Sequence, residues 1–157
     1  MTNSLNQTEW AEVRKSYKLL SQIGEGGYGI VVKAKCLKTG ESVAIKHMTD
    51  FNQREYSTRK VLREIQIMRA IQKLGTSFFP RLLNLIVSED CKDVFFIMEL
   101  EKTDIRTLLH SSGKIEFEED HAKHIMYNIL CAAHFMESAN IMHRDLKPGN
   151  ILMNDQC

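Results

Sequence analysis

Proline, tryptophan and long hydrophobic runs are scarce in this sequence, and neither charge sign is in marked excess. Among 157 residues there are 2 prolines, 1 tryptophan and 8 glycines, so a cluster of glycines is informative. A membrane-spanning helix needs roughly 18 or more apolar residues, whereas the apolar run at residues 94–98 stops at Glu99. The formal net charge is +1, and a nucleic-acid-binding surface needs a basic excess or stripe. We therefore expect neither a membrane partner nor a nucleic-acid partner.

Paired cysteines and a secretion signal are also lacking. The cysteines Cys36, Cys91, Cys131 and Cys157 are scattered without a C-x-x-C pair, which favours free thiols in a reducing compartment. The first ten residues are polar and lack the apolar stretch of a signal peptide. With 43% hydrophobic and 26% charged residues the chain can bury a core. We expect a soluble intracellular protein, with cytoplasm and nucleus both open.

The first part of the chain predicts short strands around one helix. Residues 19–23, 30–34 and 42–47 are rich in β-branched side chains and separated by glycine-containing segments, which is typical of antiparallel strands. Residues 83–87 and 94–98 flank a polar stretch suited to a hairpin loop.

The predicted helix covers about residues 54–74, and one charged residue is out of place on it. Val61, Ile65 and Met68 form its apolar stripe, and Gly75 is placed to end it. Glu64 lies three residues after Val61 and therefore on the same face, where an unpaired charge is costly. Either Glu64 sits at the rim of the stripe, which helix geometry alone favours, or it has a partner.

A second amphipathic helix is predicted over about residues 117–138. Its apolar positions recur at helical spacing and are Ala122, Ile125, Met126, Ile129, Ala133 and Met136. His121 and His124 lie three apart on it, but without a third ligand a solvated face is the better interpretation than a metal site. Pro148 and Gly149 then predict a loop, and residues 151–153 a short strand.

A glycine-rich motif occupies the junction of the first two expected strands, in the order Gly24, Glu25, Gly26, Gly27, Tyr28, Gly29, Ile30 and Val31. Alone this G-x-G-x-x-G-x-V pattern is weak, because glycines also mark tight turns. A dinucleotide-binding fold would need a helix after the glycines, whereas strand-like residues follow here. We expect a hairpin whose backbone N–H groups can approach phosphate oxygens.

Two further motifs carry charged residues in defined places. Lys46 ends the apolar segment Val43-Ala44-Ile45, where a surface lysine is the simple interpretation. A buried Lys46–Glu64 ion pair would explain both residues together. The string HRDLKPGN, residues 143–150, is far more specific than an isolated HRD triplet.

Taken in order, these motifs resemble the signature set of the eukaryotic protein kinase family. Residues 62–65, 103–106 and 138–143 resemble mitogen-activated protein kinases. The resemblance implies an α+β fold, with an antiparallel-sheet N-lobe containing one long helix and the start of a helical C-lobe. It divides the chain into a lead at residues 1–16, an N-lobe at 17–98, a hinge at 99–103 and a partial C-lobe at 104–157.

The resemblance implies ATP and Mg²⁺ as cofactors and assigns residues to them. Lys46, oriented by Glu64, would bind the α/β-phosphates beneath the glycine motif. The remaining nucleotide contacts would come from the adenine pocket and the hinge, namely Ile23, Val31, Ala44, Met98, Glu99, Glu101 and Leu152. Asp145 would accept the proton of the substrate hydroxyl, Lys147 would neutralise the transferred phosphoryl group, and Asn150 would hold Mg²⁺.

The same resemblance implies partners. Lys147 is typical of kinases that act on serine or threonine, so we expect a protein substrate with such a hydroxyl. Arg144 resembles the arginine that pairs with a phosphorylated activation loop, which implies an upstream activating kinase.

Two expected motifs have no counterpart. No Asp-Phe-Gly and no Ala-Pro-Glu occur in the sequence, so we expect these 157 residues alone to be an inactive fragment with apolar surface exposed along residues 122–136. The alternative is a truncated, non-catalytic nucleotide-binding or protein-interaction module. Trp10 and Val13 either pack on the N-lobe or belong to an unstructured lead.

Overall fold

The structure, a computed structural model, describes residues 9–26, 29–110 and 118–154. The chain divides into two units, Met1–Leu100 and Glu101–Cys157, and each is described by itself. The sequence predictions that fall on Gly27, Tyr28, Phe117 and Cys157 lie outside the described residues.

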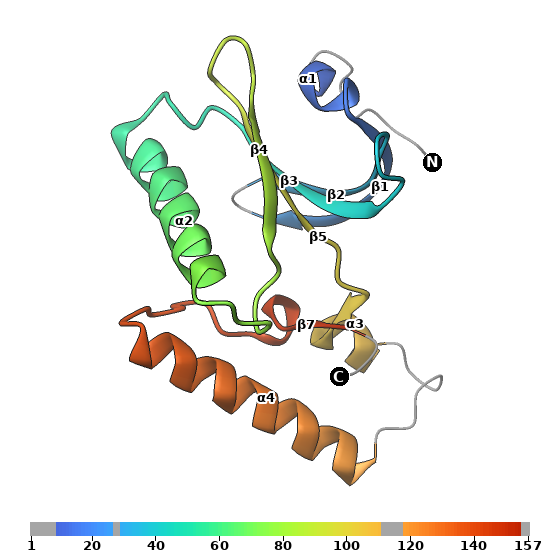
Figure 1. Cartoon of the computed structure of the whole chain (residues 1–157), viewed down its shortest axis with the longest axis vertical. Coiled ribbons are helices and arrows are strands. Elements are labelled where there is room, and N and C mark those ends of the chain that lie inside the picture. The colour runs from blue at the N-terminus through green and yellow to red at the C-terminus, as the bar shows by residue number, and fades with distance from the viewer. Residues whose placement is uncertain (1–8, 27–28, 111–117, 155–157) are drawn as a thin grey trace. The chain divides into compact units, whose positions relative to one another are not determined.

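The first unit is built on a five-stranded antiparallel sheet (Figure 1). Its strands lie in the order β1-β2-β3-β5-β4 and are β1 (Tyr17–Gly26), β2 (Gly29–Cys36), β3 (Ser42–Met48), β4 (Leu82–Val87) and β5 (Val94–Glu99). All five strands expected from the sequence are present. β1 and β2 are longer than expected because their ladder continues to the Gly26–Gly29 pair, whereas apolar patterning marks only the part that packs on the core.

Alternation along β3 divides the core of this unit between the two faces of the sheet. Val43 and Ile45 face one cluster and Met48 the other. On the first face lies α1 (Ala11–Arg14), whose Val13 is fully buried together with Trp10. On the second lies α2 (Glu55–Lys73), through Val61 and its half-buried neighbours on the apolar stripe. Trp10 and Val13 are therefore part of the core, and the unstructured alternative is wrong for them.

Helix α2 ends as its sequence predicts. Leu74 is the C-cap, Gly75 follows with φ +68°, and the amide of Gly75 donates to the carbonyl of Gln72. A left-handed residue after the last turn is the usual way to close a helix, and glycine adopts it without a Cβ penalty.

The second unit is mainly helical. Its elements are β6 (Thr103–Asp104), α3 (Ile105–His110), α4 (Glu119–Ser138), the 3-10 turn η1 (Pro148–Asn150) and β7 (Leu152–Met153), with β6 and β7 paired antiparallel. Glu118 and His121 form a reciprocal cap at the start of α4, which gives His121 a structural role. Of the apolar positions expected on α4, Ala122 and Met126 are exposed, whereas Ile125, Ile129 and Ala133 are half-buried and Met136 is buried. Tyr127 and Leu130 add exposed apolar surface on the same helix.

None of the helices in the described residues is both long enough and apolar enough to cross a membrane.

Candidate active site

The glycine motif forms the end of the β1–β2 hairpin, as expected for strand-like residues on both sides of it. Gly24 pairs with Val31, Glu25 with Ile30 and Gly26 with Gly29. Glu25 and Gly26 are exposed at this end of the hairpin, and Glu25 accepts a hydrogen bond from Gln22 at 3.0 Å. The hairpin therefore presents backbone at an exposed edge of the first unit, as a phosphate-binding loop requires.

Gly29 is required at its position by two features of the backbone. Its φ is +123°, a region that L residues rarely adopt, and a Cβ there would overlap the carbonyl oxygen of His47. Gly29 thus lets β2 start in close contact with β3, the strand that carries Lys46.

Lys46 and Glu64 form an ion pair, with Lys46 Nζ 2.6 Å from Glu64 Oε1. Lys46 is opposite Val31 on β2 and Phe96 on β5, and its ammonium lies 5.7 Å from the centre of the Phe96 ring. The exposed fractions of the two side chains are 23% and 32%, so the expected ion pair is present but is partly rather than fully buried. Glu64 thus lies at the rim of the stripe and is paired as well. The Lys46 side chain is partly exposed, so its ammonium remains accessible to an anionic ligand.

The apolar residues expected around adenine are only partly brought together. Ala44 is buried and lies opposite the half-buried Met98 across β3 and β5. Val31 is half-buried on β2, whereas Ile23 on β1 is 49% exposed. In the second unit, Leu152 is 47% exposed. Ala44, Val31 and Met98 thus supply an apolar surface on the strands next to Lys46.

Glu99 is held by Arg81, a residue that the sequence analysis did not identify. Arg81 donates from its backbone N to Glu99 Oε2 at 2.9 Å and from Nε to Glu99 Oε1 at 2.6 Å. The amide of Glu99 in turn donates to the carbonyl of Arg81 at 3.1 Å. The hydrogen bonds that the Arg81 side chain and backbone amide donate to the carboxylate lower the pKa of Glu99. The side chain of Glu99 therefore fixes the end of β5. Glu101, the other hinge candidate, belongs to the second unit and is half-buried there.

The second unit brings Asp145, Lys147 and Asn150 together within one loop. Lys147 Nζ lies 2.9 Å from Asp145 Oδ2, and Asn150 Nδ2 donates to the same oxygen at 2.8 Å. Asn150 also donates to the main-chain carbonyl of Asp145 at 2.8 Å. The hydrogen bonds from Lys147 and Asn150 lower the pKa of Asp145 and keep its carboxylate ionised.

The backbone around this loop explains why the three side chains converge. Arg144 adopts a left-handed φ of +64°, and the amide of Asp145 donates to His143 Nδ1 at 3.3 Å. After η1, the chain pairs through β7 with β6, and the amide of Ile105 donates to the carbonyl of Ile151 at 3.0 Å. The hydrogen bond from Ile105, the first residue of α3, therefore fixes the chain directly after the loop.

Asn150 fits the Mg²⁺ role in its chemistry. Its amide nitrogen is used by Asp145, which leaves the amide oxygen, a hard ligand of the kind that Mg²⁺ prefers. Within the described part of the chain, no three His, Cys, Asp or Glu side chains gather as a metal site. Asn150 would contribute its amide oxygen to such an ion, which commonly also takes water and phosphate oxygens as ligands.

Comparison with known proteins identifies relatives of the chain. Residues 17–157 match the family model described as protein kinase domain. Extracellular signal-regulated kinase 2 of Dictyostelium discoideum is 36% identical over 145 residues, covering 92% of this chain and 38% of that protein. Mitogen-activated protein kinase 13 of Oryza sativa subsp. indica is 31% identical over 150 residues, covering 96% of this chain and 29% of the relative. Mitogen-activated protein kinase homolog 1 of Petunia hybrida is 32% identical over 146 residues, covering 93% of this chain and 38% of that protein. The chain thus spans 38% or less of the length of these three relatives.

Proposed function

Because the chain belongs to the protein kinase family, we propose that its function is that of an ATP-dependent protein serine/threonine kinase of the mitogen-activated type. The γ-phosphate of ATP is transferred to a protein hydroxyl. The observation that carries the proposal is the convergence of Lys147 and Asn150 on the ionised carboxylate of Asp145. An ionised carboxylate can accept a hydrogen bond and then a proton from a substrate hydroxyl.

Each charged group has one part in this reaction. Lys46 binds phosphate oxygens of ATP, and Glu64 holds its ammonium in place. Asp145 orients the attacking hydroxyl and accepts its proton, while Lys147 neutralises charge on the phosphoryl group. Phosphoryl transfer depends mostly on positioning and charge neutralisation. Asn150 would hold a Mg²⁺ ion, which would supply further neutralisation of the phosphate oxygens.

The partners and the cellular location are part of the same proposal. The substrate is a protein with a serine or threonine hydroxyl, an upstream kinase activates the enzyme, and neither nucleic acid nor membrane is a partner. The protein acts inside the cell, in the cytoplasm, the nucleus or both. The relatives named mitogen-activated and extracellular signal-regulated kinases support this proposal.

Binding of ATP·Mg²⁺, measured by calorimetry, tests the nucleotide site. We expect Lys46→Ala to weaken binding about tenfold or more, because a charge-assisted contact to phosphate is lost. Lys35→Ala is the matched control, since Lys35 is an exposed lysine on the neighbouring strand β2. Equal affinity of the wild type and Lys46→Ala would remove Lys46 from the site.

Transfer of radiolabelled phosphate to an acceptor protein tests the chemistry. No Asp-Phe-Gly triplet occurs in the sequence, so we expect residues 1–157 alone to bind ATP without detectable transfer. Transfer that Asp145→Asn abolishes would overturn this expectation and establish the activity in the chain itself. Phosphoamino-acid analysis would then show whether serine and threonine are the acceptors.

A further inference from the structure

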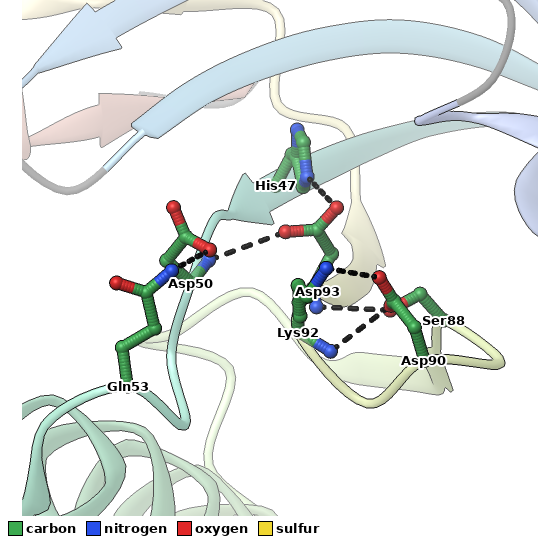
Figure 2. Close-up of polar contacts among 7 residues, drawn as sticks. All are labelled: His47, Asp50, Gln53, Ser88, Asp90, Lys92 and Asp93. Atoms are coloured by element: carbon green, nitrogen blue, oxygen red, sulfur yellow. Dashed lines mark hydrogen bonds and ion pairs between the residues drawn. The ribbon is translucent and has the colours of Figure 1, made fainter.

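The β4–β5 hairpin reaches the segment between β3 and α2 through one carboxylate, that of Asp93. Asp93 Oδ1 accepts a hydrogen bond from the backbone amide of Asp50 at 3.2 Å, and Asp93 Oδ2 lies 3.5 Å from His47 Nε2 (Figure 2). Its side chain is only 15% exposed. One half-buried acid therefore contacts the end of β3 and the connection that leads to α2.

The connection from β3 to α2 contains a strained residue that these contacts hold. Asp50 has φ +51°, a left-handed conformation that costs free energy for a residue other than glycine. The amide of the next residue, Phe51, donates to the carbonyl of Lys92 at 2.9 Å, and the carbonyl of Phe51 accepts from Thr58 Oγ1 at 2.9 Å. The hairpin thus fixes the connection, and the connection fixes the first turns of α2.

His47 on β3 lies beside the same carboxylate, at 3.5 Å from Nε2 and without a hydrogen bond to that nitrogen. Its ring is buried, stacks on Phe95 with centroids 4.4 Å apart, and meets Trp10 edge-on at 5.0 Å. Because His47 follows Lys46 directly in β3, the two side chains project from opposite faces of the sheet. Anchoring His47 on one face therefore holds the strand from which Lys46 reaches α2 on the other.

The hairpin itself orients Asp93 before it meets these groups. The amide of Asp93 donates to Ser88 Oγ at 2.9 Å, and the amide of Ser88 donates to the carbonyl of Asp93 at 2.9 Å. Asp90, in the same hairpin, contacts Ser88 and Lys92 only within the loop. Glu89, also in the hairpin, lies 3.7 Å from Lys15 Nζ, so Asp93 is the hairpin carboxylate that reaches the β3–α2 connection, and Asp90 is a natural control for it.

We propose that Asp93 is a positioning residue for the Lys46–Glu64 ion pair. It acts on Glu64 through the backbone of the β3–α2 connection, and on Lys46 through His47. Glu64 lies in α2 six positions after Thr58, whose hydroxyl is bound to the connection. The expected effect of Asp93 on ATP binding rests on the proposed function. Its effect on the placement of α2 does not, because that placement does not require a nucleotide.

Hydrogen exchange in the chain without nucleotide tests the placement of α2. We expect Asp93→Ala to increase exchange at residues 49–60, because the amide of Asp50 loses its acceptor and the bond from the Phe51 amide to the carbonyl of Lys92 is left as the hydrogen bond between the hairpin and the connection. Asp93→Asn keeps an oxygen for the Asp50 amide and should restore most of the protection. Asp90→Ala should leave this segment unchanged. Wild-type protection at residues 49–60 in Asp93→Ala would overturn the proposal.

Binding of ATP·Mg²⁺ tests the effect on the ion pair by a double-mutant cycle. We expect Asp93→Ala to weaken binding roughly threefold to tenfold, within the usual range of coupling between contacting networks. In a Glu64→Gln background the same change should have little further effect, since the pair to be positioned is gone. A fully additive effect would overturn the proposal. Failure of the wild type to bind ATP would instead refute the proposed function, and exchange would still decide whether Asp93 holds α2.

Discussion

At the scale of single residues, His47 makes stability depend on pH. Burial lowers the pKa of His47 below its usual 6.5, although Asp93 and Glu9 act in the opposite direction. The unfolded chain therefore binds a proton more readily than the folded chain between pH 6.5 and the lower folded pKa. We expect the free energy of unfolding to decrease as the pH falls from about 7 to about 5.

Urea unfolding at a series of pH values measures this decrease. His47→Phe keeps an aromatic ring against Phe95 but cannot titrate, so its stability should change less over the same range. His134→Ala is the control, because His134 is 80% exposed on α4. A slope as steep in His47→Phe as in the wild type would assign the pH dependence to other groups.

The residues of the site were predictable to different degrees. Glu64 could be found because a carboxylate on an apolar helix stripe needs an explanation, and Lys46 is its partner in the structure. Arg81 and Asp93 carried no such signal, because neither interrupts a helical apolar stripe and the partner of each lies in a different segment. Their positions depend on strand register and loop geometry, which local patterns do not specify.

At the scale of elements, Gly29 decides how closely the β1–β2 hairpin approaches β3. We expect Gly29→Ala to destabilise the protein by roughly 1–3 kcal/mol, the usual cost of a strained backbone residue, with added overlap at the carbonyl of His47. Gly75→Ala is the matched comparison, since its φ is +68° but a Cβ there meets nothing within 4 Å. Denaturant unfolding should show the larger loss for Gly29→Ala, and equal losses would contradict the importance of the close approach.

Element type was easier to predict than element extent. Short β-branched or apolar runs located the five strands of the first sheet, and apolar periodicity located the two long helices. The four-residue α1 and the two-residue β6 are too short to show a period. The hinge expected at residues 99–103 includes Glu99, which ends β5, and Thr103, which begins β6. Such ends are set by pairing partners elsewhere in the chain.

At the scale of the whole molecule, the two units differ in how much core they contain. In Met1–Leu100, Trp10, Phe95 and Ile45 are fully buried within one cluster. In the described part of Glu101–Cys157, the buried hydrophobic side chains are Met136 and Met153. Since buried apolar area is the main source of stability, the first unit should be the more stable.

This difference predicts unfolding transitions that depend on the probe. The single tryptophan, Trp10, reports on the first unit alone, whereas helical circular dichroism includes the 20-residue α4 of the second unit. We expect the circular dichroism signal to begin falling at lower urea concentration than the tryptophan fluorescence, because the less stable second unit unfolds first. A two-state transition of the whole chain would instead give coincident curves. Trp10→Phe serves as the blank for fluorescence and should keep the early dichroism loss. Coincident midpoints would instead mean that the small core of the second unit unfolds only together with the first.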